Sequence, residues 1–137
     1  MVVRLKLRIR RGDIAVEEVA LLNSGYEAPT PQLLIPVELA RRLGLWPPEG
    51  AADVLLDTAG GPLRAWYFPR EASVEVAVDD ERSQAVVVDL VISPLADEPL
   101  ISDKLAGALQ IAVEDFAEGL WRFRWEPKEV LRRSASR

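Results

Sequence analysis

One stretch constrains the fold of this chain more than any other: an apolar strand that ends in a small polar turn. Residues 19–22 read Val-Ala-Leu-Leu and run directly into Asn23-Ser24-Gly25. A short apolar strand, Leu33–Ile35, follows, and then a helical pattern in which Leu39 and Leu43 lie one turn apart. A strand, a turn, a second strand and a short helix in this order place the turn at the bottom of a cleft. Residues 23–25 are therefore the first candidate functional site.

The residues before this stretch predict a strand hairpin. From Val3 to Ile9, apolar residues alternate with basic ones, which is the period of a half-buried strand. Gly12-Asp13 predicts a tight turn, and Ile14–Leu22 returns as a second strand that becomes more apolar toward Asn23. We interpret the basic residues as the solvent face of an edge strand rather than as a nucleic-acid patch. They are Arg4, Lys6, Arg8 and Arg10.

Two segments together resemble the retropepsin-like aspartic peptidases of the prokaryotic or archaeal type. In that family a strand ends in Asp-Thr-Gly or Asp-Ser-Gly, and a Leu-Ile-Pro-like strand and a Leu-Gly-Leu-like helix end follow, as residues 19–25 and 33–45 do here. The later run Pro99–Ile111 is similar to the family's apolar pair, glycine, short helix and return strand, with Ser102 in place of the glycine. The resemblance spans roughly Leu5 to Val113.

The resemblance implies a mostly β fold: a retropepsin-like closed barrel of short strands with one or two short helices and a flap hairpin. Residues 1–126 would form this domain, and residues 127–137 a flexible C-terminal tail. Strand patterns at 53–57 and 63–68 flank a glycine-containing tip, which the resemblance identifies as the flap over a bound peptide. The flap tip consists of Thr58, Ala59, Gly60 and Gly61, and the support of the cleft of Leu100, Ile101, Ser102 and Asp103.

The family's chemistry needs two carboxylates that share one proton, because like charges in contact cannot both ionise. A chain of 137 residues with one such motif must borrow the second carboxylate from a twofold partner, so the resemblance implies a homodimer. Here Asn23, the only asparagine, stands where the family has its catalytic aspartate. An amide cannot take a proton from water. The sequence therefore predicts an aspartic endopeptidase scaffold that binds peptides but is inactive, with Ser24 holding the loop by hydrogen bonding.

Several alternatives stay open at this point. Asn23 fits a natural pseudoenzyme, an engineered replacement, or a relative with another function, such as a non-enzymatic peptide-binding or assembly module. A rival catalytic position is Asp57, which ends an apolar strand pattern, but no second strand and helix follow it. Residues 120–125 form an aromatic strand that suits either core packing or a subunit interface. Adjacent acidic residues such as Glu17 and Glu18 are read as solvated side chains, not as a glycosidase dyad or a Ca²⁺ site.

The composition excludes several classes of function. Without Cys or His, the chain offers no Ser-His-Asp or Cys-His catalysis, no zinc site of those residues and no disulfide. A net charge of −5 argues against a nucleic-acid partner, and no apolar run is long enough for a membrane helix. We expect a cytoplasmic protein, because no signal-peptide pattern follows Met1. We also expect no cofactor and no metal. The scarcity of heat-labile residues is typical of a thermophile, although codon bias can also produce it.

Overall fold

The first two strands form the hairpin expected from the alternating residues. The computed structural model describes residues 2–58 and 61–137. In it β1 (Arg4–Arg11) pairs antiparallel with β2 (Ile14–Leu22), and Gly12 at the turn has φ +56°, which a glycine adopts without steric cost. The apolar residues of β1 point into the core, whereas its basic residues lie along the outside and pair with glutamates.

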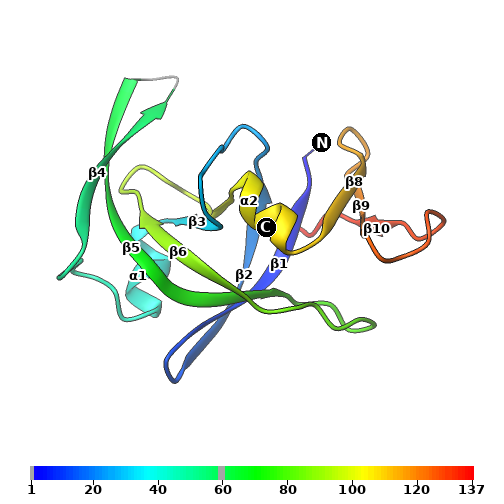
Figure 1. Ribbon diagram of the computed structural model, residues 1–137, viewed down its shortest axis with the longest axis horizontal. Coiled ribbons are helices and arrows are strands. Elements are labelled where there is room, and N and C mark those ends of the chain that lie inside the picture. Colours follow the sequence, from blue (N-terminus) through cyan, green and yellow to red (C-terminus); the bar gives the residue numbers. More distant parts are fainter. Residues whose placement is uncertain (1, 59–60) are drawn as a thin grey trace.

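Six strands close into a barrel (Figure 1). Besides β1 and β2, these are β3 (Gln32–Ile35), β5 (Gly61–Val76), β6 (Val86–Ile92) and β7 (Leu100–Ile101). The order around the barrel is β1-β2-β7-β3-β6-β5, and β5 pairs back onto β1 to complete the ring. β7 pairs parallel with β2 on one side and antiparallel with β3 on the other. β3 in turn pairs parallel with β6. This architecture confirms the predicted mostly β closed barrel.

Two short helices pack against the barrel, as the sequence predicted. Helix α1 (Val37–Arg42) begins after Pro36, and Gly44, with φ +75°, lies just beyond its end. Helix α2 (Asp103–Ala108) begins at Ser102, whose hydroxyl accepts a hydrogen bond from the Leu105 backbone. Within residues 2–58 and 61–137, neither helix has the length and apolar character needed to cross a membrane.

The hairpin of β4 (Ala52–Thr58) and β5 extends beyond the barrel, where the sequence predicted the flap. Ala59 and Gly60 of the predicted tip lie outside the described residues, and Thr58 pairs with Gly61. The strand pattern predicted from the sequence ends at residue 68, whereas β5 is one 16-residue strand that continues to Val76. A register shift between Phe68 and Ala72, with Arg70 at φ +49°, bends the strand so that it serves both the hairpin and the barrel.

The C-terminal part forms a second sheet beside the barrel. Its strands are β8 (Ile111–Asp115), β9 (Leu120–Phe123) and β10 (Arg132–Arg133). Trp121 and Phe123 are buried in the main core, so the aromatic strand supplies core packing. Residues 127–137 differ from the expected tail: β10 pairs with β9, and the Ser134 hydroxyl accepts a hydrogen bond from the Arg4 backbone at 2.7 Å. The Arg132 guanidinium over the Trp121 ring and these hydrogen bonds hold the segment against β9 and the start of β1.

Candidate functional site

Asn23 lies where β2 leaves the barrel, next to the end of β7. Leu21 and Leu22 of β2 pair with Leu100 and Ile101 of β7, and the Asn23 backbone N–H donates to the Ile101 carbonyl at 3.2 Å. The two segments that carry the retropepsin resemblance, far apart in the sequence, are therefore neighbours in the fold. The resemblance assigns both segments to one site, which stays a prediction; the structure shows that they are adjacent in the barrel.

The turn at residues 23–25 is held by the Asn23 side chain. Its Oδ1 accepts a hydrogen bond from the Gly25 backbone at 3.0 Å, while its backbone carbonyl accepts one from Tyr26 at 3.0 Å. A Cβ at position 25 would lie 3.3 Å from this Oδ1, which is a tight contact, so glycine suits the turn. The Ser24 side chain is exposed and has no hydrogen-bond partner in the described part of the chain. Within one chain the amide of Asn23, not the hydroxyl of Ser24, orders the loop.

Ser102 and Asp103 clamp the loop that follows Asn23. The fully buried Ser102 hydroxyl accepts from the Gln32 backbone at 3.0 Å in addition to capping α2. Asp103 accepts a hydrogen bond from the Ala28 backbone at 3.0 Å and donates its own backbone N–H to the Tyr26 carbonyl at 2.9 Å. The predicted support residues thus fix both ends of the loop 26–32. Their role in the structure is to position the loop rather than to carry out chemistry.

A hollow of about 260 Å³ opens beside Asn23 and Ser24. Asp103 is the one carboxylate that lines it among the described residues, and the Asp103 Oδ1 is already bonded to backbone N–H groups. The remaining lining is largely apolar and includes the half-exposed Phe116. One chain therefore offers hydrogen-bonding groups and apolar surface here, but no pair of carboxylates. The lining residues are Leu22, Asn23, Ser24, Asp103, Ala106, Gly107, Ile111, Val113 and Phe116.

A buried carboxylate near the same loop was missed by the sequence analysis. Asp89 of β6 is 4% exposed and accepts hydrogen bonds from the Tyr67 hydroxyl, the Thr30 hydroxyl and the Arg70 backbone. Burial acts to raise the pKa of Asp89, but these three donors together hold that pKa below its ordinary value. The signal in the sequence was a single charge within an otherwise apolar strand.

Other groups near Asp89 respond to its charge. The hydrogen bond to Asp89, together with burial, raises the pKa of the Tyr67 hydroxyl. The pKa of Tyr26 is raised chiefly by burial and, in addition, by the Asp89 charge. The Tyr26 hydroxyl donates a hydrogen bond to the Gln32 side chain at 2.8 Å. Both tyrosines therefore stay neutral and act as hydrogen-bond donors at any ordinary pH. The network ties the loop 26–32 to the root of the β4–β5 hairpin.

The remaining predicted residues belong to that hairpin. In Figure 1 the β4–β5 hairpin rises at the upper left, and the loop that follows β2 lies along the same upper side of the barrel. The backbone of Asp57, the rival catalytic candidate, pairs with Pro62 across the hairpin. Asp57 is therefore a hairpin-strand residue, whereas Asn23 lies at the junction of two barrel strands.

No protein-family model and no curated protein matches this chain. The fold and site define the class of the protein only as a small closed β barrel with a loop junction at Asn23. Its function has to be proposed from the geometry and chemistry of that junction.

Proposed function

We propose that this chain is an aspartic-peptidase-like protein that binds extended peptides and does not cleave them. One observation carries the proposal: Asn23 ends β2 directly beside Ile101 of β7, with Ser102 opening α2 next to it. The retropepsin resemblance assigns the catalytic aspartate to this position. The β4–β5 hairpin, which extends from the barrel as a flap would, supports the same proposal.

The amide at position 23 is the reason that we propose binding without cleavage. A peptidase of this type needs a carboxylate that removes a proton from the attacking water and a second group that returns one. The Asn23 amide can donate and accept hydrogen bonds but has no basic form, and its oxygen already accepts from the Gly25 N–H. It can still orient a peptide group, so binding survives where hydrolysis does not.

The proposal includes a twofold homodimer. A dyad would require two copies of residue 23, and the hollow beside Asn23 contains only Asp103 as a carboxylate among the described residues. A symmetric pair of chains would place the two junctions face to face and enclose a peptide between them. Backbone hydrogen bonds to the β4–β5 hairpin would then hold the peptide as an added strand.

The substitution Asn23→Asp tests the function. We expect the unmodified protein to bind members of a peptide mixture without releasing fragments in mass spectrometry, and Asn23→Asp to cleave peptides at acidic pH. The two introduced carboxylates would share one proton, so one of the two pKa values should rise well above about 3.9. Asn23→Ala is the matched control and should remain inactive.

The outcomes of this experiment separate the two functions. Cleavage by Asn23→Asp alone supports a peptidase scaffold that has lost its base. If Asn23→Asp binds the same peptides and cleaves none between acidic and neutral pH, the peptidase origin fails, and a non-enzymatic binding module replaces it. If neither protein binds peptides, the proposed function is wrong as a whole.

A further inference from the structure

The turn at residues 23–25 contains the only asparagine of the chain. Asparagine is heat-labile because its side-chain amide can be lost as ammonia, which leaves a carboxylate. The usual route is attack by the backbone nitrogen of the following residue on the side-chain Cγ. Here that residue is Ser24, whose small side chain leaves its nitrogen accessible. Asn23 therefore lies in the sequence context of a deamidation site.

The hydrogen bonds of the folded turn direct the Asn23 side chain toward the backbone that follows it. Its Oδ1 accepts from the Gly25 N–H at 3.0 Å, so the side chain bends toward the peptide group of Ser24. A backbone N–H bonded to this oxygen also stabilises the negative charge that develops on the oxygen when Cγ is attacked. The Asn23 amide is therefore held on the side of the attacking nitrogen and polarised for attack.

The attacking group and the leaving group are both unbonded within residues 2–58 and 61–137. The Ser24 N–H donates to no described residue, and the Asn23 Nδ2 has no acceptor there. Ser24 and Gly25 are exposed, Asn23 is half-buried, and the hollow of about 260 Å³ opens beside Asn23 and Ser24. Water thus reaches the turn, and the Ser24 N–H has no hydrogen bond to break before the reaction begins.

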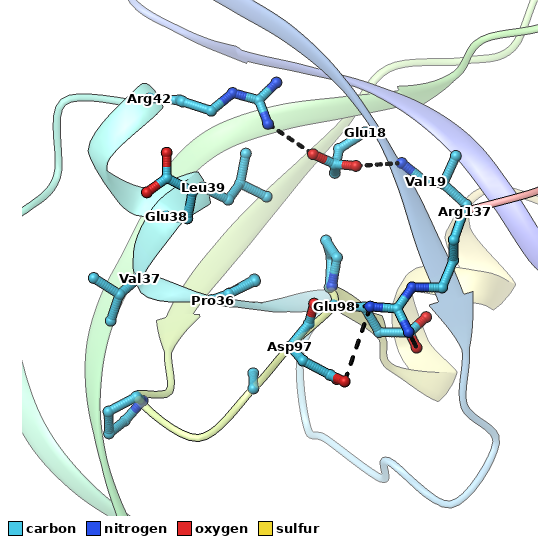
Figure 2. Close-up of a pocket in the computed structure, with 13 residues that line it drawn as sticks. Glu18, Val19, Pro36, Val37, Glu38, Leu39, Arg42, Asp97, Glu98 and Arg137 are labelled. Carbon is cyan, nitrogen blue, oxygen red and sulfur yellow. Dashed lines mark hydrogen bonds and ion pairs between the residues drawn. The ribbon is translucent and has the colours of Figure 1, made fainter.

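The larger pocket on the outside of the barrel offers no unpaired carboxylate to the junction at Asn23 (Figure 2). It measures about 450 Å³, lies between β2, α1 and the loop 93–99, and has none of its described lining residues in common with the hollow. Each of its four carboxylates forms an ion pair with an arginine, at 2.7–3.9 Å. In Figure 2, Arg42 reaches Glu18 in this way. At the junction itself the Asp103 Oδ1 is bonded to backbone N–H groups, so a new carboxylate there has to arise from Asn23.

We propose that Asn23 is a modification site: it deamidates in the folded protein and so supplies the carboxylate that peptidase chemistry lacks here. The Ser24 nitrogen gives up its proton and forms a bond to Cγ. The Cγ–Nδ2 bond breaks, and Nδ2 leaves as ammonia with one added proton. Water then opens the cyclic imide at the bond between Cγ and the Ser24 nitrogen: its hydroxyl goes to Cγ and its hydrogen returns to the nitrogen. The product is an aspartate at position 23.

The effect on activity rests on the proposed function, whereas the modification itself does not. The new carboxylate can accept from the Gly25 N–H as the amide oxygen did, so the turn is retained. In the proposed homodimer, cleavage needs two carboxylates that share a proton, so both copies of residue 23 must be converted. Cleavage activity should therefore rise with the square of the converted fraction when copies pair at random. Fresh protein binds peptides, and aged protein also cleaves them.

The test is incubation of the purified protein at mildly alkaline pH, below its unfolding temperature. Samples are taken over time for mass spectrometry and for peptide cleavage at acidic pH. We expect the fragment that contains residue 23 to show the mass change of deamidation, and cleavage to appear with it after a lag. Water that opens the imide at its other carbonyl gives isoaspartate, which chromatography separates from the aspartate product. The same protein unfolded in urea is incubated in parallel.

Three substitutions at the exposed position 24 test the attacking group. Ser24→Pro removes the N–H without removing a hydrogen bond among the described residues, and Ser24→Ala is the matched control that keeps the N–H. Deamidation should nearly stop in the first variant and proceed at the natural rate in the second. Ser24→Val keeps the N–H but shields it with a branched side chain, so deamidation should slow several-fold. Tryptophan fluorescence verifies that each variant is folded.

The proposal is overturned if Asn23 stays unmodified in the folded protein while it deamidates in urea. It is also overturned if Ser24→Pro and Ser24→Val both deamidate as fast as Ser24→Ala, or if the aged protein contains only isoaspartate. Aged protein that contains the aspartate but cleaves nothing, while Asn23→Asp cleaves, overturns it as well. All of these results leave the proposed function intact. If Asn23→Asp itself cleaves nothing, the peptidase origin and the activation fail together.

Discussion

Replacing Asp89 should cost a large part of the stability of this protein. The Asp89 carboxylate is buried and accepts hydrogen bonds from Tyr67, Thr30 and the backbone of Arg70. A hydrogen bond to a charged group contributes about 1.5–3 kcal/mol, and a buried donor left without an acceptor costs about 1–3 kcal/mol. The Thr30 hydroxyl is exposed and can bond to water after the change, so losing its hydrogen bond to Asp89 costs little stability. We expect Asp89→Ala to lower the free energy of unfolding by about 3–5 kcal/mol.

The conservative change Asp89→Asn keeps the shape of the side chain and removes its charge, so it measures the contribution of the charge. The asparagine oxygen can still accept from the Arg70 N–H, and the two hydroxyls can rotate to accept from its amide. We expect a loss of about 1–2 kcal/mol, smaller than for alanine. Because the pKa of Asp89 is lower in the folded protein than in the unfolded chain, its charge contributes stability above the unfolded pKa of about 3.9. That contribution is lost as the pH falls through the folded pKa.

Urea unfolding followed by fluorescence of the four tryptophans measures these effects. The difference in unfolding free energy between the natural protein and Asp89→Asn should be largest near neutral pH and should shrink below about pH 4. Two results would refute the reasoning: an Asp89→Ala protein within about 1 kcal/mol of the natural one, or a difference between the natural protein and Asp89→Asn that does not change with pH.

Two further changes test the support of the site and of the C-terminal sheet. Ser102→Ala removes the α2 cap and the acceptor for the Gln32 N–H. Thermal unfolding should therefore show a free energy of unfolding lower by about 1–3 kcal/mol. Arg132→Met leaves the nearly buried Glu126 without its bidentate partner and should cost about 3–5 kcal/mol. Arg132 also holds the pKa of Glu126 low, so the second loss should be greatest above the ordinary pKa of a glutamate, about 4.3, and diminish in acid. Stability within 0.5 kcal/mol of the natural protein in either case would contradict the assigned contacts.

Much of the barrel follows from local patterns in the sequence. The alternation in β1 and the turn at Gly12 are set by residues close together in the chain, and both were predicted correctly. The junction of Asn23 with Ile101 was predicted only through the resemblance, because strand order between distant segments leaves no periodic signal.

The features that were missed depend on contacts between distant segments. Arg70 adopts φ +49° in β5, and an arginine gives no turn signal. Its conformation is supported by the hydrogen bond from its N–H to Asp89, 19 residues away. Residues 127–137 look polar and frayed in isolation, but Arg132 lies over the rings of Trp121 and Phe123, and β10 pairs with β9. These contacts join residues that are far apart in the chain, so no local sequence pattern predicts them.

In the proposed dimer, residue 23 faces its own copy across a twofold axis, and a disulfide tests this directly. The natural chain has no cysteine, so Asn23→Cys carries a single thiol. Two such residues can join only if their Cα atoms approach to about 4.4–6.8 Å. Asp13→Cys, on the exposed β1–β2 turn, is the control for random collision. Under mild oxidation and non-reducing electrophoresis, we expect Asn23→Cys to form a covalent dimer rapidly and Asp13→Cys to stay largely monomeric. Equal rates of dimer formation by the two variants, or an Asn23→Cys protein that stays monomeric, would contradict the twofold cleft.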